Sequence, residues 1–266
     1  MLFVLDIGNT NVVAGVFEGE RLVHEWRLGT DRRRTADEWG MLFRQLFSLS
    51  GLRMEAVGGA IVSSVVPPVM AEIERFFERY FHLMPLIVGP GIRTGLKIQL
   101  DNPREVGADR ITNAVAAVDI YGPPLIIVDF GTATTFCFVD EEGTYRGGVI
   151  APGVLISMEA LYANAAKLPK VELVHPPDVV GKNTVEAMQS GLFYGYLGLV
   201  EGLIERLKRR FRRPPTVVAT GGLGEAFASA TKAIDLYDPH LTLKGLRRIY
   251  ELNRRTATEP STDGER

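Results

Sequence analysis

Residues 2–13 read LFVLDIGNTNVV, and residues 125–136 read LIIVDFGTATTF. A shift of 123 positions superimposes the two stretches, placing Asp6 on Asp129 and the glycine that follows each on its counterpart. Each stretch is an apolar run ending near an aspartate, then a short polar loop, then a second apolar run. A turn containing glycine and a third run follow in both places. The repeat predicts a β-meander at the start of each of two similar α/β halves.

The segments that follow each meander alternate between helix-like and strand-like patterns. Apolar residues three and four apart indicate amphipathic helices, and short apolar runs indicate strands. Helices are expected at 36–49, after Pro67-Pro68, around 111–118, and at 153–166, 184–211 and 242–252, with strands at 60–66 and 216–219. The two halves are predicted to span residues 1–116 and 117–255. The polar tail, 256–266, is expected to be disordered.

Composition excludes several classes of protein. The chain is 46% hydrophobic and 23% charged with a net charge of −2, so nothing in bulk charge attracts nucleic acid or an anionic membrane. Its longest uncharged stretch, 56–71, is interrupted by two prolines and too short to span a membrane. The opening residues do not form a signal peptide. The single cysteine, Cys137, can form no internal disulfide. We therefore expect a soluble cytoplasmic protein that binds neither nucleic acid nor membrane.

Each hairpin loop carries residues suited to binding phosphate. Gly8 and Gly131 allow positive φ and are expected to let the backbone approach a ligand closely. An aspartate at the strand end, such as Asp6, suits Mg²⁺, which takes few carboxylates. Ordinary hairpins closed by Asx turns are the alternative. The loop side chains that can surround phosphate oxygens are Asn9, Thr10, Asn11, Thr132, Thr134 and Thr135.

A third glycine site lies late in the chain. Thr220-Gly221-Gly222 follows a short predicted strand and precedes a predicted helix start. Backbone N–H groups there could face the ribose or α-phosphate of a nucleotide. A plain turn between strand and helix explains the same residues equally well.

These motifs together resemble a known family. DIGNTN at 6–11, DFGTATT at 129–135 and TGG at 220–222 resemble the phosphate and adenosine motifs of the acetate kinase, sugar kinase, Hsp70 and actin superfamily. DNPREVGADR at 101–110 and GGVIAPG at 147–153 narrow the resemblance to type III pantothenate kinases, over residues 1–255. It implies two ribonuclease-H-like halves, an actin-like duplication, with a cleft between them. It also implies ATP-dependent phosphorylation of pantothenate to 4′-phosphopantothenate, the first step of coenzyme A biosynthesis.

The resemblance assigns the nucleotide and its ions. Asp6 would help to hold Mg²⁺, and Asp129 would bind a monovalent cation, K⁺ or NH₄⁺. The three acidic residues Asp6, Asp109 and Asp129 are expected to converge on one triphosphate and its acceptor alcohol. The residues implied to bind ATP are Asp6, Ile7, Gly8, Asn9, Thr10, Asn11, Val12, Val13, Thr132, Gly221 and Gly222.

The resemblance also assigns the substrate site. Asp109 would accept or orient the proton of the pantothenate hydroxyl; taken alone, it could merely stabilise a helix start. Thr184 would contact substrate across a homodimer interface, although a helix cap before Val185 is an alternative role. Many relatives carry an aromatic residue where this chain has Leu100, so apolar packing on substrate is the role left to it. The implied substrate-binding residues are Gly107, Ala108, Asp109, Arg110, Thr184 and Leu100.

Other interpretations remain open from the sequence. The same motifs are compatible with a kinase for another small hydroxy acid or sugar, with a phosphatase, or with a non-catalytic nucleotide-binding protein that regulates transcription. Glycines at 191, 195, 198 and 202 form a small-residue face, which fits either packing inside the subunit or a two-fold interface. The run Arg32-Arg33-Arg34 is interpreted as a solvated loop.

Overall fold

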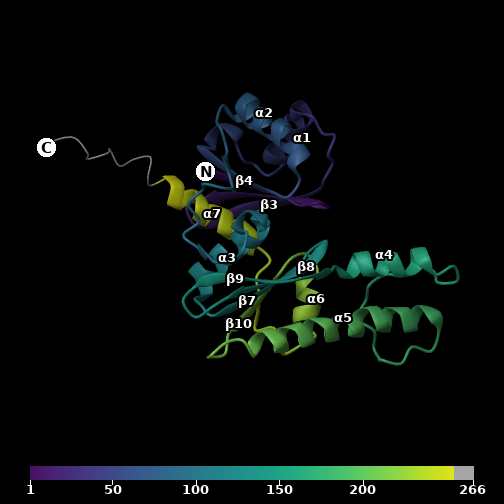
Figure 1. Ribbon diagram of the computed structural model, residues 1–266. Helices are drawn as coiled ribbons and strands as arrows, with labels where there is room; N and C mark the ends of the chain where they lie inside the picture. Colours follow the sequence, from purple (N-terminus) through teal and green to yellow (C-terminus); the bar gives the residue numbers. More distant parts are fainter. Residues whose placement is uncertain (255–266) are drawn as a thin grey trace. The chain divides into compact units, whose positions relative to one another are not determined.

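The computed structural model describes residues 1–254, so the predicted disordered tail lies outside the described residues. Contacts divide the described chain into two compact units (Figure 1). The first unit contains residues 1–96, 102–116 and the helix Leu241–Arg254, and the second contains residues 97–101 and 117–240. Among the described residues, no helix combines the length and the apolar character that crossing a membrane requires.

The first unit is built on a five-stranded sheet with the order β3-β2-β1-β4-β5. Its first three strands form the predicted antiparallel meander, because each apolar run is followed by a tight turn. The last two strands continue the sheet in parallel. The strands are β1 (Leu2–Ile7), β2 (Asn11–Glu18), β3 (Arg21–Gly29), β4 (Gly59–Ser64) and β5 (Leu86–Ile87).

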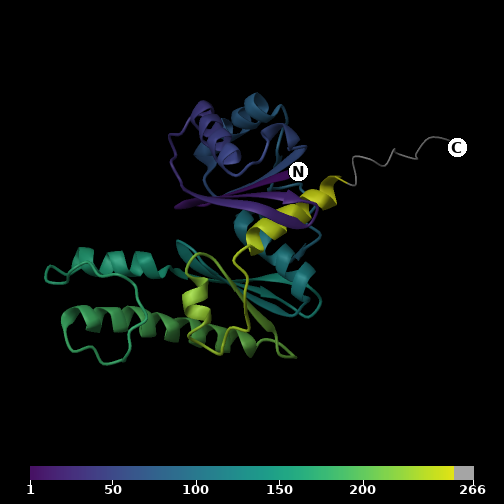
Figure 2. The ribbon, with the colours of Figure 1, turned by 180° about the vertical axis from the view of Figure 1, so that it is seen from behind.

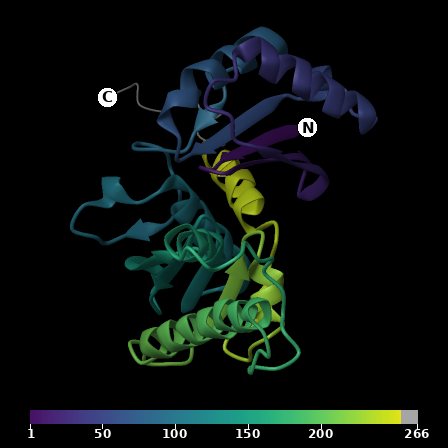
Figure 3. The same cartoon turned by 90° about the vertical axis from the view of Figure 1, so that its right-hand side faces the viewer.

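Alternate residues of β1 face opposite sides of this sheet, and helices cover both sides. Phe3, Leu5 and Ile7 pack with the aromatic residues of α1 (Ala36–Leu49) and α2 (Met70–Phe81). Val4 faces the other side, where α3 (Ala108–Tyr121) and α7 (Leu241–Arg254) supply apolar side chains. Figures 1 and 3 show α1 and α2 on one side of these strands and α7 on the other. Short 3₁₀ turns occupy Met54–Ala56, Pro67–Val69 and Pro103–Glu105.

Helix α7 lies in the first unit, although the predicted linear division places it in the second half. Its buried residues Leu243, Leu246 and Ile249 form a stripe that joins the core of the first sheet. A Cβ on Gly245 would lie 2.1 Å from the carbonyl oxygen of Thr112, so glycine lets α7 approach the backbone of α3. The chain therefore returns to the first unit at its last helix.

The second unit repeats the sheet order of the first. Its order β9-β8-β7-β10-β11 matches β3-β2-β1-β4-β5, and β6 is added beside β9. This repetition confirms the duplication that the two LxxxDxG stretches predict. The strands are β6 (Lys97–Ile98), β7 (Leu125–Phe130), β8 (Ala133–Val139), β9 (Thr144–Pro152), β10 (Thr216–Thr220) and β11 (Leu236–Tyr237). The strands β5, β6 and β11 have two residues each, which is too short for a periodic apolar pattern, so the sequence does not predict them.

Three helices complete the second unit: α4 (Val154–Asn164), α5 (Thr184–Lys208) and α6 (Gly224–Ala228). The middle of α5 packs on the sheet through Phe193 and Val200, in a core that also contains Phe130 and Phe227. Helices α4 and α5 run side by side, as Figure 2 shows from behind. Helix α5 ends at Lys208, three residues before the predicted end.

Candidate active site

The first predicted phosphate loop is a tight hairpin in which Gly8 donates its N–H to the carbonyl of Asn11 at 2.9 Å. Asn9, Thr10 and Asn11 are exposed, so the loop is open to a ligand. Neither Gly8 nor Gly131 uses the positive φ that glycine allows. Glycine at position 8 relieves crowding in the turn, because a Cβ there would lie 3.1 Å from the carbonyl oxygen of Asn11.

Asp6 lies half-buried at the end of β1, beside Ser63 in the parallel register with β4. The Ser63 side chain is fully buried, and its Oγ has no hydrogen-bond partner. No group of three or more metal-ligating side chains occurs among residues 1–254. A carboxylate beside an unsatisfied hydroxyl fits Mg²⁺, because this ion keeps most of its water and phosphate ligands and takes few from protein.

Asp109 lies in the first turn of α3, as predicted. A Cβ on Gly107 would lie 2.4 Å from Asp109 Oδ1 and 3.8 Å from Val65 Cγ1. Val65 in turn donates its N–H to the carbonyl of Ile7 at 3.1 Å. The GADR segment therefore begins near Val65, which follows β4 and is hydrogen-bonded to the end of β1. A meeting of Asp109 with Asp6 and the first loop stays a prediction.

Burial raises the pKa of the Asp109 carboxyl above its ordinary value, while the backbone N–H and the positive charge of Arg110 oppose that rise. The N–H of Arg110 lies 2.8 Å from Asp109 Oδ1. A carboxylate with a raised pKa accepts a proton more readily than an exposed one. This environment is compatible with the predicted role of proton acceptor, and that role stays a prediction.

The second loop has the same design in the second unit. Gly131 donates its N–H to the carbonyl of Ala133 at 3.2 Å, and Thr132 is exposed beside it. Asp129 lies at the end of β7, with its Oδ1 2.6 Å from where a Cβ on Gly221 would be. Glycine at that position lets the chain after β10 pass close to the carboxylate and to the backbone of Phe130. Binding of a monovalent cation by Asp129 stays a prediction.

The glycine pair after β10 brings its own backbone close to that aspartate. Gly221 has a φ of +90°, which suits glycine, and its carbonyl accepts the Tyr237 hydroxyl at 3.1 Å. The helix that follows, α6, has only five residues. Contact between a nucleotide and the Gly221-Gly222 backbone stays a prediction.

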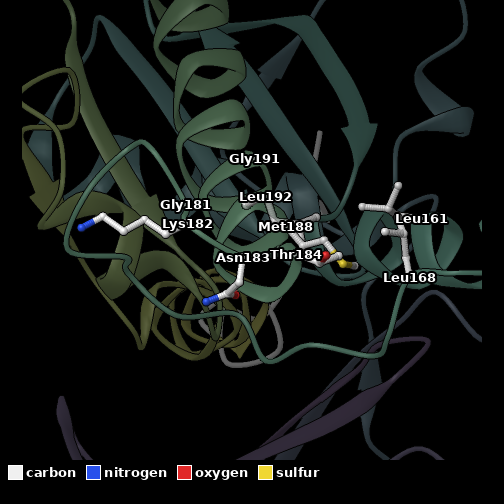
Figure 4. Close-up of a pocket in the computed structure, with 10 residues that line it drawn as sticks. Leu161, Leu168, Gly181, Lys182, Asn183, Thr184, Met188, Gly191 and Leu192 are labelled. Atoms are coloured by element: carbon white, nitrogen blue, oxygen red, sulfur yellow. The ribbon is translucent and has the colours of Figure 1, made fainter.

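Thr184 begins α5 but does not cap it. The cap is Asn183, whose Oδ1 accepts the N–H of Glu186 at 3.0 Å. The exposed Thr184 lines a cavity of about 630 Å³ with the apolar side chains of Leu161, Leu168 and Met188 (Figure 4). Lys182 points away from those leucines in the same view. The cap role predicted as an alternative for Thr184 is therefore wrong.

The remaining predicted substrate residues belong to different units. Leu100 follows β6 in the second unit and contacts Gly147, where a Cβ would lie 3.2 Å from Leu100 Cδ2. Gly107, Ala108 and Arg110 lie with Asp109 in the first unit. Four of the six predicted substrate-binding residues, including Asp109, therefore lie together in the first unit. Leu100 and Thr184 lie in the second.

Residues missed by the sequence reading also contact the loops. Arg32 donates to Asn9 Oδ1 at 3.2 Å, and Arg34 lies 4.4 Å from the centre of the Trp39 ring, so the arginine run is not simply solvated. Thr30 and Gly153 each donate a backbone N–H to a loop carbonyl. The shift of 123 positions relates Thr30 to Gly153, and this repeat was the signal that could have found them.

Solved structures with distant sequences share this fold. A proposed Baf family transcriptional activator from Campylobacter jejuni gives a TM-score of 0.59 at 19% identity, covering 95% of this chain and 99% of that one. Component A of (R)-2-hydroxyglutaryl-CoA dehydratase from Acidaminococcus fermentans gives 0.52 at 12% identity, covering 97% and 100%. With the repeated sheet order, these likenesses confirm the predicted class, an α/β protein of two similar actin-like halves.

Comparison of sequences narrows this class to one family. Residues 2–206 match the model of the type III pantothenate kinase family. The Type III pantothenate kinase of Bacillus cytotoxicus is 58% identical over 253 residues, which cover 95% of this chain and 97% of that protein. The chain therefore belongs to the type III pantothenate kinase family, as the motifs indicate.

Proposed function

We propose that this protein transfers the γ-phosphoryl group of ATP to the primary hydroxyl of pantothenate, giving 4′-phosphopantothenate for coenzyme A biosynthesis. Membership of the family makes it a phosphotransferase with an alcohol acceptor. The observation that supports the proposal is the half-buried carboxylate of Asp109, in a segment that begins near Val65, whose N–H is bonded to Ile7 at the end of β1. Phosphoryl transfer to an alcohol needs a group that orients the attacking hydroxyl and groups that hold the phosphates of ATP.

Each residue has a proposed task in this reaction. Asp109 accepts or orients the hydroxyl proton, and Arg110 attracts the anionic end of pantothenate. The loop from Asp6 to Val13 surrounds the phosphates, and Thr132 contacts them as well. Mg²⁺, held in part by Asp6, would neutralise charge on the phosphates, and K⁺ or NH₄⁺ at Asp129 would do the same. Leu100 would pack on the apolar part of the substrate.

An ATP-consumption assay over a panel of small hydroxy acids and sugars tests the proposal. Among these acceptors, only pantothenate is expected to support ATP consumption. Mass spectrometry of the product should find pantothenate with one added phosphoryl group. Asp109→Asn should lose this activity, whereas Asp119→Asn, at an exposed position of the same helix, should retain it. ATP binding without turnover on any acceptor would instead favour a regulatory protein. Turnover on another acceptor would identify a different kinase.

A homodimer is the second part of the proposal, and the helices α4 and α5 supply its interface. A Cβ on Gly191, Gly195 or Gly198 would meet no atom within 4 Å, which argues against packing inside the subunit. Only two residues of α4 are buried, although its sequence is largely apolar. Large apolar side chains are exposed on and next to this hairpin: Leu155, Ile156, Leu161, Val179, Val180, Val185 and Leu199.

A second copy of this protein is the partner that fits this apolar surface best, because Thr184 and the cavity that it lines adjoin the same helices. Gly195→Glu should give a monomer in sedimentation experiments and raise the KM for pantothenate. Gly58→Glu is the matched control, since that glycine is also exposed and meets open space in the first unit. A Gly195→Glu protein that stays dimeric would remove this interface. A cytoplasmic location, without nucleic-acid or membrane partners, completes the proposal.

A further inference from the structure

The residue that follows the third strand of each meander holds the loop of that meander. Thr30 follows β3, and its backbone N–H donates to the carbonyl of Thr10 at 3.0 Å. Gly153 follows β9, and its backbone N–H donates to the carbonyl of Thr132 at 3.1 Å. The same backbone contact therefore occurs in both units, at positions related by the repeat.

The first unit adds a side-chain contact to this arrangement. The Thr30 hydroxyl donates to the carbonyl of Gly8 at 2.7 Å, and Thr30 is half-buried. One residue thus holds two carbonyl groups of the loop, at Gly8 and at Thr10. Arg32, two residues later, holds the side chain of Asn9 between them.

Fixing these carbonyls also fixes the direction of the amides that follow. A peptide bond is planar and trans, so its C=O and the next N–H point in opposite directions. With the Gly8 carbonyl directed at Thr30, the N–H of Asn9 points away from Thr30. The Thr10 carbonyl fixes the N–H of Asn11 in the same manner. An exposed loop that would otherwise sample several peptide orientations is held in one.

The second unit reaches the same result without a side chain. A Cβ on Gly153 would lie 2.3 Å from the carbonyl oxygen of Thr132 and 2.7 Å from that of Gly131. The backbone itself occupies the place where a side chain would be. The hydroxyl is therefore a feature of the first loop alone.

We propose that Thr30 is a positioning residue for ATP, whose hydroxyl holds the Gly8 peptide so that the Asn9 N–H faces a phosphate oxygen. This inference rests on the proposed function, in which the loop binds the phosphates of ATP. Thr30 touches neither ATP nor pantothenate and acts through the loop. Loss of its hydroxyl should accordingly weaken ATP binding and leave the pantothenate site unchanged.

The test compares Thr30→Val with Thr30→Ser. Valine keeps the shape but loses the donor, and its methyl group cannot approach the Gly8 oxygen as closely as a hydroxyl does. Loss of one such hydrogen bond predicts a 3- to 10-fold rise in the KM for ATP, about the factor that a single hydrogen bond contributes. The KM for pantothenate should stay constant. Serine restores the donor and should restore the KM for ATP.

Ser50→Ala is the matched control. The Ser50 hydroxyl lies 2.9 Å from Nε2 of His24, a residue of β3, the strand that Thr30 follows. This variant should leave both KM values unchanged. Titration calorimetry with a non-hydrolysable ATP analogue measures the same effect without turnover. Thermal unfolding of all variants separates loop positioning from general loss of stability.

Three outcomes would overturn the inference. An unchanged KM for ATP in Thr30→Val would show that the hydroxyl does not position the loop. Equal rises in the KM for ATP and the KM for pantothenate, with a lower melting temperature and no rescue by serine, would indicate a purely structural role. A wild-type protein that binds no ATP analogue would overturn the proposed function itself, and the role of Thr30 with it.

Discussion

The two hairpin loops have the same origin in sequence and differ in construction. Four residues separate the paired Ile7 and Val12 in the first, and three separate the paired Phe130 and Thr134 in the second. The shift of 123 positions therefore changes to 122 in the second strand of the meander and returns to 123 in the third, where Thr30 corresponds to Gly153. Duplication has preserved the strand order and the backbone contact to each loop, while loop length and side chains diverged.

The surroundings of the two loops differ even more. The first unit contains the half-buried carboxylate of Asp109, whose pKa burial raises. The second contains Asp129, which lies close to the backbone of Gly221. We propose that the first carboxylate accepts a proton and that the second binds a cation. The predictions below test this proposed division of roles between the two units.

Asp109→Asn should produce the largest effect, since it removes the group unique to the first unit. We expect turnover to fall by about 10²- to 10⁴-fold, as for loss of a general base, with ATP affinity nearly intact. Because burial raises the Asp109 pKa, the ionised form destabilises the folded state at pH above that pKa. The neutral variant should thus unfold at a higher temperature than wild type at pH 8. Steady-state kinetics and calorimetry measure both effects, and near-normal turnover would remove Asp109 from the mechanism.

Gly153→Ala should disturb the second loop by contact alone. Its φ of −64° suits any residue, so the 2.3 Å approach to the Thr132 carbonyl is the only obstacle to a side chain. Overpacking of this kind costs about 1–3 kcal/mol, and we expect a KM for ATP about 10-fold higher with a lower melting temperature. Gly29→Ala, where a Cβ meets open space, is the control. Equal behaviour of the two variants would contradict a tightly held second loop.

Replacing K⁺ with Na⁺ should lower activity about fivefold, the effect expected for about 1 kcal/mol from a partly exposed ion pair. Asp129→Asn should abolish the difference between the two salts, since the cation would lose its carboxylate. Activity assays in matched chloride buffers measure this, with Asp119→Asn as the control. If wild type is equally active in both buffers, Asp129 has no role in cation binding.

Arg110→Gln should give the smallest effect on kcat, a shift in its pH dependence. The charge of Arg110 lowers the Asp109 pKa against the larger effect of burial, so its loss raises that pKa further. The acceptor must be ionised, and activity is lost as pH falls through its pKa. The acid limb of kcat should therefore move to higher pH, measured with both substrates saturating. Arg44→Gln, at an exposed position of α1, is the control and should leave the pH profile unchanged. If the profile of Arg110→Gln also stays unchanged, the charge of Arg110 does not influence the pKa of Asp109.

Local patterns were sufficient for much of this protein. The apolar and polar periodicity predicted both meanders and the bounds of α1, because amphipathic elements show their spacing directly in the sequence. The glycine motifs together with the segments 101–110 and 147–153 were sufficient to indicate the family. Convergence of Asp6, Asp109 and Asp129 on one ligand stays a prediction.

Contacts between distant residues were decided only by the tertiary structure. Periodicity marks one side of α7 as apolar, but the partner of that side, the first sheet, depends on packing across more than 200 residues of chain. The turn at Gly8 is closed by approach to Asn11 and by Thr30, so its φ could not be inferred from glycine alone. A sequence determines which surfaces must be buried. The surface that each one meets is chosen by shape and hydrogen bonding once the chain has folded.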